Sequence, residues 1–149
     1  MNRLELTSAI FREIGIIQER VDFLLKQNLP QNLPPTQFKV LNHLIYTTNT
    51  DETVSELASN SHVSLPAMSQ IIKQLINKGF VKLHVRTQDA RKKTIEITKQ
   101  GRNAHDQARQ QVAVDIQPLA NEFKLNELNT LHQSLHQYRI HFEQTVATK

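Results

Sequence analysis

The feature that most constrains the fold is a change in the spacing of apolar residues between Thr53 and Gly101. Up to Gly79 the apolar residues recur every three or four positions, as in amphipathic helices. After Gly79 they alternate with polar residues, as in half-buried strands. The stretch therefore predicts two short helices followed by a hairpin. A unit of this kind can place a helix in one groove of duplex DNA and a hairpin beside it.

Local signals predict where these elements begin and end. Thr53 and Glu56 have the spacing of a capping box at the start of a short helix. Ser64 caps the next helix, in which Pro66 is tolerated in the first turn. Gly79 is the residue expected at a left-handed position after that helix. The apolar face of the second helix is formed by Met68, Ile71, Ile72 and Leu75.

The predicted hairpin has a basic tip. Val81, Leu83 and Val85 alternate with polar residues in the first strand, as do Ile95 and Ile97 in the second. Arginine at such a tip suits a narrow minor groove, whose negative potential attracts it. The connecting loop, RTQDARKK, carries four basic residues, namely Arg86, Arg91, Lys92 and Lys93.

The polar side of the helix predicted over residues 65–78 has no acidic residue, so it suits a groove lined by phosphates. We predict that this helix enters the major groove. The alternative is that these side chains are ordinary solvated residues. The hairpin with its basic tip is called the wing below. In addition to the four basic residues of the wing, the predicted DNA contacts are Ser64, Pro66, Ala67, Ser69, Gln70, Lys73 and Gln74.

The distribution of charge supports a polyanionic partner. The chain has a net charge of +4. Residues 64–102 hold nine Lys and Arg against two acids, a charge of +7, while the remainder holds nine against twelve, a charge of −3. Positive charge concentrated on an otherwise acidic chain is typical of nucleic-acid binding, although a solvated basic face is the simpler alternative.

Long helices are predicted at both ends of the chain. Each has an apolar stripe with steps of three and four residues, and more apolar surface than one small domain can cover. A second copy of the chain is the natural cover. The helix over residues 4–27 contributes Ile10, Ile14, Ile17, Val21 and Leu24, and the last helix contributes Leu128, Leu131, Leu135, Tyr138 and Phe142. Before the last helix, Pro118 predicts a bend or a break.

Several classes of protein are excluded or disfavoured. There is no cysteine, so disulfides, thiol redox sensing and thiolate metal sites are excluded. No catalytic or nucleotide-binding motif occurs, and three glycines leave no room for a phosphate loop. We therefore expect neither an enzyme nor a cofactor. We also expect neither a membrane span nor a signal peptide, and therefore predict a cytoplasmic protein.

The sequence resembles the MarR family of bacterial winged-helix regulators. The resemblance lies in Asp89-Ala90-Arg91, followed by a strand and Ile97-Thr98-Lys99-Gln100-Gly101, and in three further stretches: 33–41, Val54-Ser55-Glu56-Leu57-Ala58 and 75–81. It implies a mainly α, winged helix–turn–helix fold with a two-stranded wing. It also implies one domain over residues 1–149, with a DNA-binding part at 34–100 and dimerisation helices at 1–30 and 101–149. The function implied is that of a homodimeric, ligand-responsive repressor on a pseudo-palindromic operator.

The resemblance also implies roles for individual residues. Ser69 and Gln70 occupy positions that often meet bases, and glutamine where the family commonly has arginine favours adenine over guanine. Arg91 is carried over as the minor-groove residue of the wing, with Asp89 as its orienting partner, and Ala90 stands where many members have a second arginine. A small anionic or phenolic effector would bind in a pocket lined by Phe11, Arg12, Ile14, His43 and Tyr46.

Two alternatives stay open. His132 and His136 are four residues apart, a spacing that can hold zinc if a third ligand such as His105 joins them. A solvated pair of histidines is the simpler interpretation. The same helices could also form a protein-interaction module that does not bind DNA. Such a module would show little dependence of binding on salt, whereas DNA binding would weaken steeply.

Overall fold

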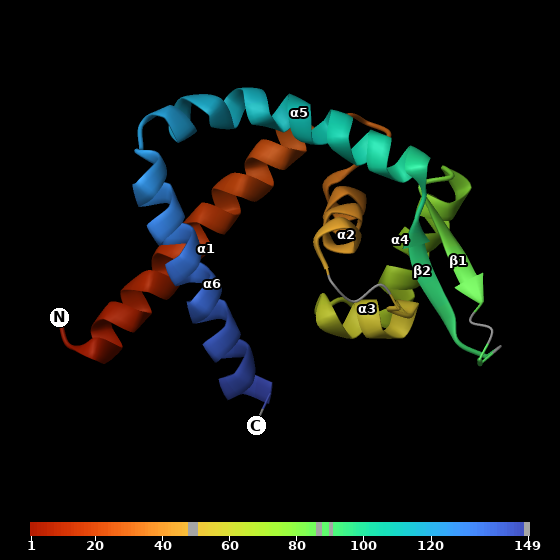
Figure 1. Ribbon diagram of the computed structural model, residues 1–149, viewed down its shortest axis with the longest axis horizontal. Coiled ribbons are helices and arrows are strands. Elements are labelled where there is room, and N and C mark those ends of the chain that lie inside the picture. Colours follow the sequence, from red (N-terminus) through yellow and green to blue (C-terminus); the bar gives the residue numbers. More distant parts are fainter. Residues whose placement is uncertain (48–50, 86–87, 90, 148–149) are drawn as a thin grey trace. The chain divides into compact units, whose positions relative to one another are not determined.

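The computed structural model describes residues 1–47, 51–85, 88–89 and 91–147, and within them the chain forms six helices and two strands (Figure 1). The predicted mainly α fold with a two-stranded wing is confirmed. Two compact units are formed, Met1–Val112 and Ala113–Lys149. The elements in chain order are α1 (Arg3–Asn28), α2 (Pro35–Tyr46), α3 (Val54–Asn60), α4 (Leu65–Asn77), β1 (Val81–Val85), β2 (Lys93–Ile97), α5 (Lys99–Asn121) and α6 (Leu125–Ala147).

The predicted capping signals are confirmed by the hydrogen bonds at the helix ends. The Thr53 hydroxyl accepts the Glu56 amide at 3.2 Å, and the Glu56 carboxylate accepts the Thr53 amide at 2.9 Å. Ser64 caps α4 by accepting the Ala67 amide at 3.3 Å. Gly79 follows α4 with φ of 73°, the left-handed conformation that glycine adopts without strain.

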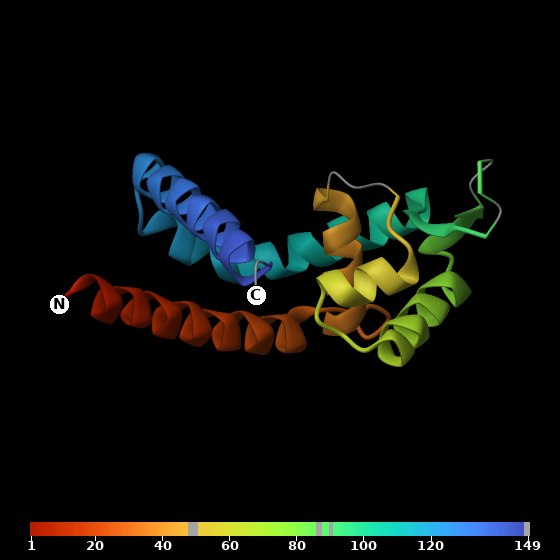
Figure 2. The same ribbon diagram turned by 90° about the horizontal axis from the view of Figure 1, so that it is seen from below.

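The core of the first unit lies among α2, α3, α4 and the base of the hairpin, which Figure 2 shows grouped together. Met68, Ile72 and Leu75 form the buried face of α4, as the spacing predicts. They pack in one cluster with Leu41 of α2 and Leu57 of α3, both fully buried. The acid-free polar face of α4 is therefore directed away from the core.

The hairpin departs from simple alternation of buried and exposed residues. Its strands are antiparallel and pair Val81 with Ile97 and Leu83 with Ile95. Val81, Ile95 and Ile97 are buried, but Leu83 is 40% exposed and Val85 is 47% exposed. Strand β2 is buried at Thr94, Ile95 and Ile97, whereas β1 leaves the core beyond Val81.

Helix α5 begins at a polar junction with the end of α4. The Thr98 hydroxyl donates to the Gly79 carbonyl at 2.6 Å and accepts the Gly101 amide at 3.0 Å. Pro118 lies inside α5, which continues to Asn121. The helix is therefore not broken at this proline, which lies within its last turn.

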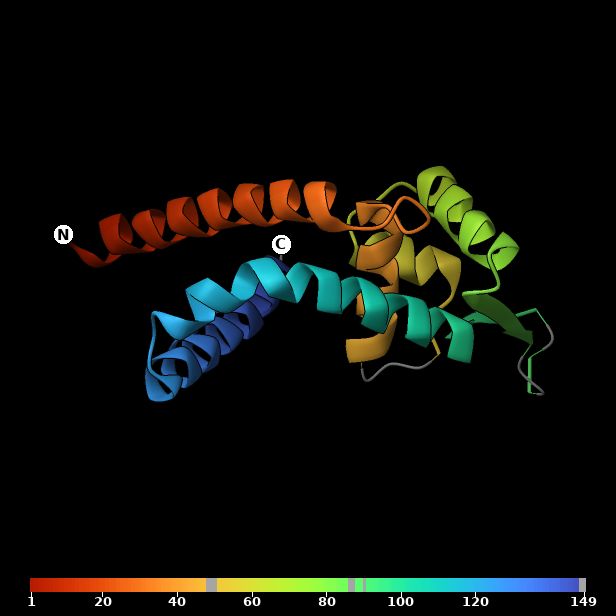
Figure 3. The same cartoon turned by 90° about the horizontal axis from the view of Figure 1, so that it is seen from above.

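His105 joins α5 to α2 inside the first unit, where α5 crosses α2 (Figure 3). Its ring is buried and stacks on Phe38, with ring centroids 5.0 Å apart and planes 10° apart. Tyr46 meets it edge-on at 6.2 Å, and Nε2 lies 3.0 Å from Oδ1 of Asn42. Burial lowers the pKa of His105 below its usual 6.5, and Arg109 adds to this effect. The ring is therefore a neutral part of the core.

Both units expose large apolar side chains on their long helices. On α1 of the first unit Ile14, Ile17 and Phe23 are exposed, whereas Ile10 is half-buried. On α6 of the second unit Leu128 and Tyr138 are half-buried, and Leu131, Leu135 and Phe142 are exposed. None of the helices in the described part of the chain has the length and apolar character needed to cross a membrane.

Two glycines in helices predict opposite effects of substitution by alanine. A Cβ on Gly101 would lie 2.1 Å from the Phe80 carbonyl oxygen, whereas a Cβ on Gly15 of α1 would meet nothing within 4 Å. We expect Gly101→Ala to lower the free energy of unfolding by at least about 2 kcal/mol, because backbone must move. Gly15→Ala should raise it by up to about 1 kcal/mol, because alanine favours the helix. Urea titrations test both, and a neutral Gly101→Ala would contradict the packing described.

His105 predicts a dependence of stability on pH. The pKa of its ring is lower in the fold than in the unfolded chain, so below about pH 6.5 the unfolded chain binds a proton that the folded chain does not. This contribution to stability is present above pH 6.5 and is lost as the pH falls. Urea unfolding at about pH 7.5 and about pH 5.5 should show a larger loss for wild type than for His105→Gln. Equal losses would show that His105 is not held neutral.

Candidate nucleic-acid interface

The polar face of α4 presents most of the predicted DNA contacts to solvent. Ser64, Pro66 and Ala67 are exposed at the start of the helix, and Ser69, Gln70 and Lys73 are exposed along it. The amide of Gln70 has both a donor and an acceptor, which is what recognition of a base edge requires. This face therefore has the chemistry of a reading helix, and no carboxylate lies on it.

Gln74, also predicted to contact DNA, is tied to the fold. Its Oε1 accepts a hydrogen bond from Nε2 of the buried Gln37, with 2.8 Å between the two atoms. The Gln37 Oε1 in turn accepts Nζ of Lys78 at 2.6 Å, and the same Nζ donates to the Asn32 carbonyl at 2.6 Å. These bonds, called the clamp on Gln37 below, fix the C-terminal half of α4 on α2. Sequence spacing alone did not indicate this, because the partners lie 37 and 41 residues apart.

The wing tip is shaped by Asp89. Its Oδ1 accepts the backbone amide of Arg91 at 3.0 Å, and its carbonyl accepts the amide of Lys92 at 3.0 Å. Asp89 thus orients Arg91 through the backbone. Arg91 and Lys93 are exposed, and Lys92 is half-buried. The predicted contact Arg86 and the departure at Ala90 lie outside the described residues.

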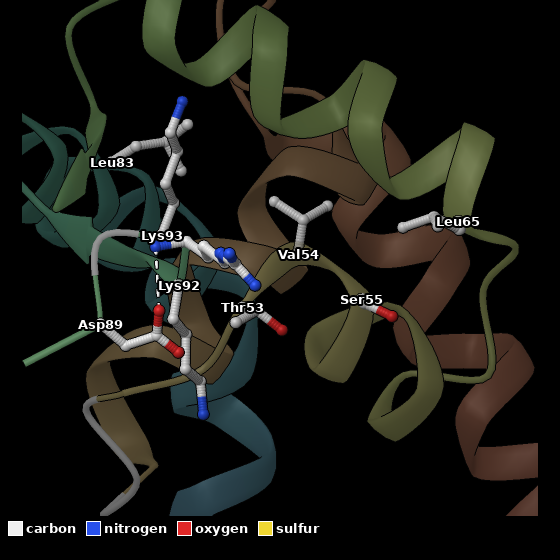
Figure 4. A pocket seen from close by; sticks show the side chains of 9 residues that line it. Thr53, Val54, Ser55, Leu65, Leu83, Asp89, Lys92 and Lys93 are labelled. Atoms are coloured by element: carbon white, nitrogen blue, oxygen red, sulfur yellow. Dashed lines mark hydrogen bonds between the residues drawn. The ribbon is translucent and has the colours of Figure 1, made fainter. Parts of the chain in front are cut away.

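An open groove of about 550 Å³ brings the wing together with the starts of α3 and α4 (Figure 4). Three of the predicted contacts line it, and they supply the positive charge: Arg91, Lys92 and Lys93. Sequence reasoning missed five other lining residues, Thr53, Val54, Ser55, Leu65 and Leu83. Thr53 had a signal as a helix cap, but the spacing could not reveal that both helix starts face the wing.

A buried carboxylate, that of Glu52, comes directly before the groove-lining Thr53 in the sequence. The side chain of Glu52 accepts Nδ2 of Asn60 at 3.0 Å and lies 2.6 Å from Nε2 of His43. Its backbone carbonyl accepts the Ile95 amide at 2.9 Å. Glu52 therefore connects α2, the end of α3 and β2 at a single point.

The residues of the predicted effector pocket lie on two helices. His43 of α2 contacts Glu52, and Tyr46 contacts His105, so each meets a residue outside the predicted set. Phe11, Arg12 and Ile14 are exposed on α1. The pocket remains a prediction.

The histidines of α6 form a stacked pair. The rings of His132 and His136 have centroids 6.4 Å apart, and a guanidinium nitrogen of Arg139 lies 3.4 Å from Nδ1 of His136. Among the described residues, no group of three or more His, Cys, Asp or Glu side chains could hold a metal ion. His105 belongs to the other compact unit and is buried against α2.

Comparisons with known proteins agree with this geometry. Residues 33–93 match the sequence model of the MarR family. Wild-type MarR from E. coli without ligand is 28% identical, with a TM-score of 0.69 over 85% of this chain and 94% of that one. A cysteine-to-serine mutant of the same protein complexed with operator DNA is 26% identical, with a TM-score of 0.66 over 93% and 99%. The transcriptional regulator BldR from Sulfolobus solfataricus shares the fold, with a TM-score of 0.70 at 20% identity over 92% and 99%. No curated protein matches the chain significantly.

The contacts of α4 predict different effects of two equivalent substitutions. Gln74→Ala removes the acceptor of Gln37, which leaves a buried amide without its partner, and should lower the free energy of unfolding by about 1–2 kcal/mol. Gln70→Ala removes the same amide from an exposed position and should change stability by less than about 0.5 kcal/mol. Urea titration of the two variants measures the difference. Equal stabilities would mean that the clamp on Gln37 contributes nothing.

Proposed function

We propose that this chain, whose residues 33–93 match the sequence model of the MarR family, is a sequence-specific, double-stranded DNA-binding transcription regulator of that family. It acts as a homodimer on a pseudo-palindromic operator. The observation that carries the proposal is the acid-free, exposed face of α4 beside a groove lined by Arg91, Lys92 and Lys93. The MarR structure with operator DNA supports it by likeness of fold.

Each part of the site has a distinct role in binding. Helix α4 enters the major groove, where Gln70 donates to and accepts from the edge of an adenine. Arg91 enters the adjacent minor groove, held by the turn that Asp89 shapes, and Lys92 and Lys93 contact phosphates. Two α4 helices of a dimer then meet half-sites roughly 34–36 Å apart.

Dimerisation covers the apolar faces of the long helices. In each compact unit, taken by itself, large aliphatic and aromatic side chains remain exposed, which is typical of an interface rather than of a monomer surface. Ile17 of α1 and Leu131 of α6 are 59% and 56% exposed. Burial of such residues against a second copy supplies the hydrophobic free energy of association.

The regulator acts as a repressor that responds to a small anionic or phenolic effector. The effector binds near Phe11, Arg12, Ile14, His43 and Tyr46. Support comes from the position of His43, which contacts Glu52, while the Glu52 carbonyl holds β2. A ligand that displaces His43 would therefore act on the base of the wing and change its position for DNA. The protein works in the cytoplasm, where its operator lies.

Salt dependence of DNA binding tests the proposed function. A duplex selected from a random pool should bind with an affinity that falls steeply as salt rises, because Lys and Arg release counterions from phosphates. Arg91→Ala should weaken binding and reduce the slope of log K against log salt by about 1.8, which is about 0.9 for each protomer of the dimer. Lys124→Ala, which removes one positive charge from the second unit, is the control and should leave both quantities unchanged.

Three results would contradict this proposal in different parts. Failure of the pool to yield a bound sequence, or binding without salt dependence, would favour a protein-interaction module. Unaltered binding by Arg91→Ala would remove the wing from the DNA contact. A stable folded monomer in sedimentation at micromolar concentration would contradict the homodimer.

A further inference from the structure

Lys92, one of the predicted phosphate contacts in the DNA-facing groove, forms an ion pair with an acidic residue, Glu56. Nζ of Lys92 lies 3.4 Å from Oε1 of Glu56, and the two side chains are 37% and 46% exposed. Lys92 lines the groove beside the start of α3, where Figure 4 shows it close to Thr53. The lysine is therefore not free in the chain without DNA.

Glu56 cannot easily move away from this position. Its other carboxylate oxygen, Oε2, accepts the Thr53 backbone amide at 2.9 Å, and the Thr53 hydroxyl accepts the Glu56 amide in return. The bond from the Thr53 backbone is the largest cause that lowers the pKa of Glu56, and Lys92 lowers it further. At neutral pH the carboxylate is thus ionised and fixed to the helix start, whereas Lys92 has a long, flexible side chain.

A phosphate that binds Lys92 must therefore replace Glu56 as the partner of this lysine. The Glu56 carboxylate, which Thr53 holds in place, then remains near the DNA backbone. We propose that Glu56 is a built-in competitor of DNA phosphate: it holds Lys92 in the free chain and lowers the affinity for every duplex, whatever its base sequence. This inference rests on the proposed function. Glu56 thereby makes binding depend more on the base contacts of α4 and less on the phosphate backbone.

The hairpin offers a matched control. Nζ of Lys82 lies 3.6 Å from Oε2 of Glu96, so this pair has the same charges and a similar distance. Lys82 and Glu96 are cross-strand partners at a register position next to that of Leu83, which lines the groove. Side chains of adjacent residues in a strand point to opposite faces, so the control pair faces away from the groove.

The experiment compares Glu56→Gln and Glu96→Gln in the full chain on a random-sequence duplex over a series of salt concentrations. Glutamine is compatible with the capping box, so Glu56→Gln should fold normally, which thermal unfolding checks. At about 50 mM salt Glu56→Gln should bind about two- to fivefold more tightly than wild type for each protomer of the dimer, the range expected for one exposed ion pair. Its log K should fall with log salt more steeply by about 1.8, because Lys92 of each protomer then contributes one full phosphate contact. Glu96→Gln should match wild type.

A second background separates competition for Lys92 from simple repulsion. In Lys92→Gln the substitution Glu56→Gln should raise affinity by less than the single variant does, because no lysine remains to be released. An equal gain in both backgrounds, or an equal gain from Glu96→Gln, would overturn the proposal. If wild type binds with a salt slope but Glu56→Gln gains nothing, only this inference fails. If wild type shows no salt-dependent binding, the proposed function fails with it.

Discussion

The arrangement of α2, α3 and the wing depends on the buried carboxylate of Glu52. A carboxylate in a protein interior is unfavourable unless hydrogen bonds and charges compensate it. Here His43 and Asn60 bond its two oxygens, and its carbonyl takes the Ile95 amide. Because these partners come from α2, α3 and β2, one arrangement of the three elements satisfies the carboxylate. The groove beside the wing, which the start of α3 lines, depends for its shape on that arrangement.

Helix α2 is attached to α4, α5 and the wing by polar or aromatic contacts. The buried Gln37 of α2 forms hydrogen bonds with Gln74 and Lys78 at the end of α4. His43 of α2 contacts the carboxylate of Glu52, whose backbone carbonyl accepts a hydrogen bond from the wing. Phe38 receives α5 by stacking on His105. These contacts are directional, unlike the aliphatic core around Leu41, so they fix where the polar face of α4 points as well as how firmly the helix is held.

Much of this could be predicted from the sequence, and the part that could not has a common cause. The helices, their caps and the turn at Gly79 follow from signals within a few residues of one another, and they were predicted correctly. The clamp on Gln37, the burial of Glu52 and the exposure of Leu83 depend on which elements meet in space. Gln74 illustrates the difference, since its position on the polar face of α4 predicted a DNA contact but could not reveal a partner in α2.

The contacts around Glu52 and those around Gln37 differ in the length of chain that each closes. Glu52 lies nine residues from His43 and eight from Asn60, whereas Gln37 lies 37 residues from Gln74. The entropy lost on closing a loop rises with its length, so the longer closure costs about 1 kcal/mol more. The corner formed by α2 and α3 can therefore assemble as a local event during folding. Docking of α4 onto α2 is the step limited by a long-range encounter, because Gln37 and Gln74 lie 37 residues apart.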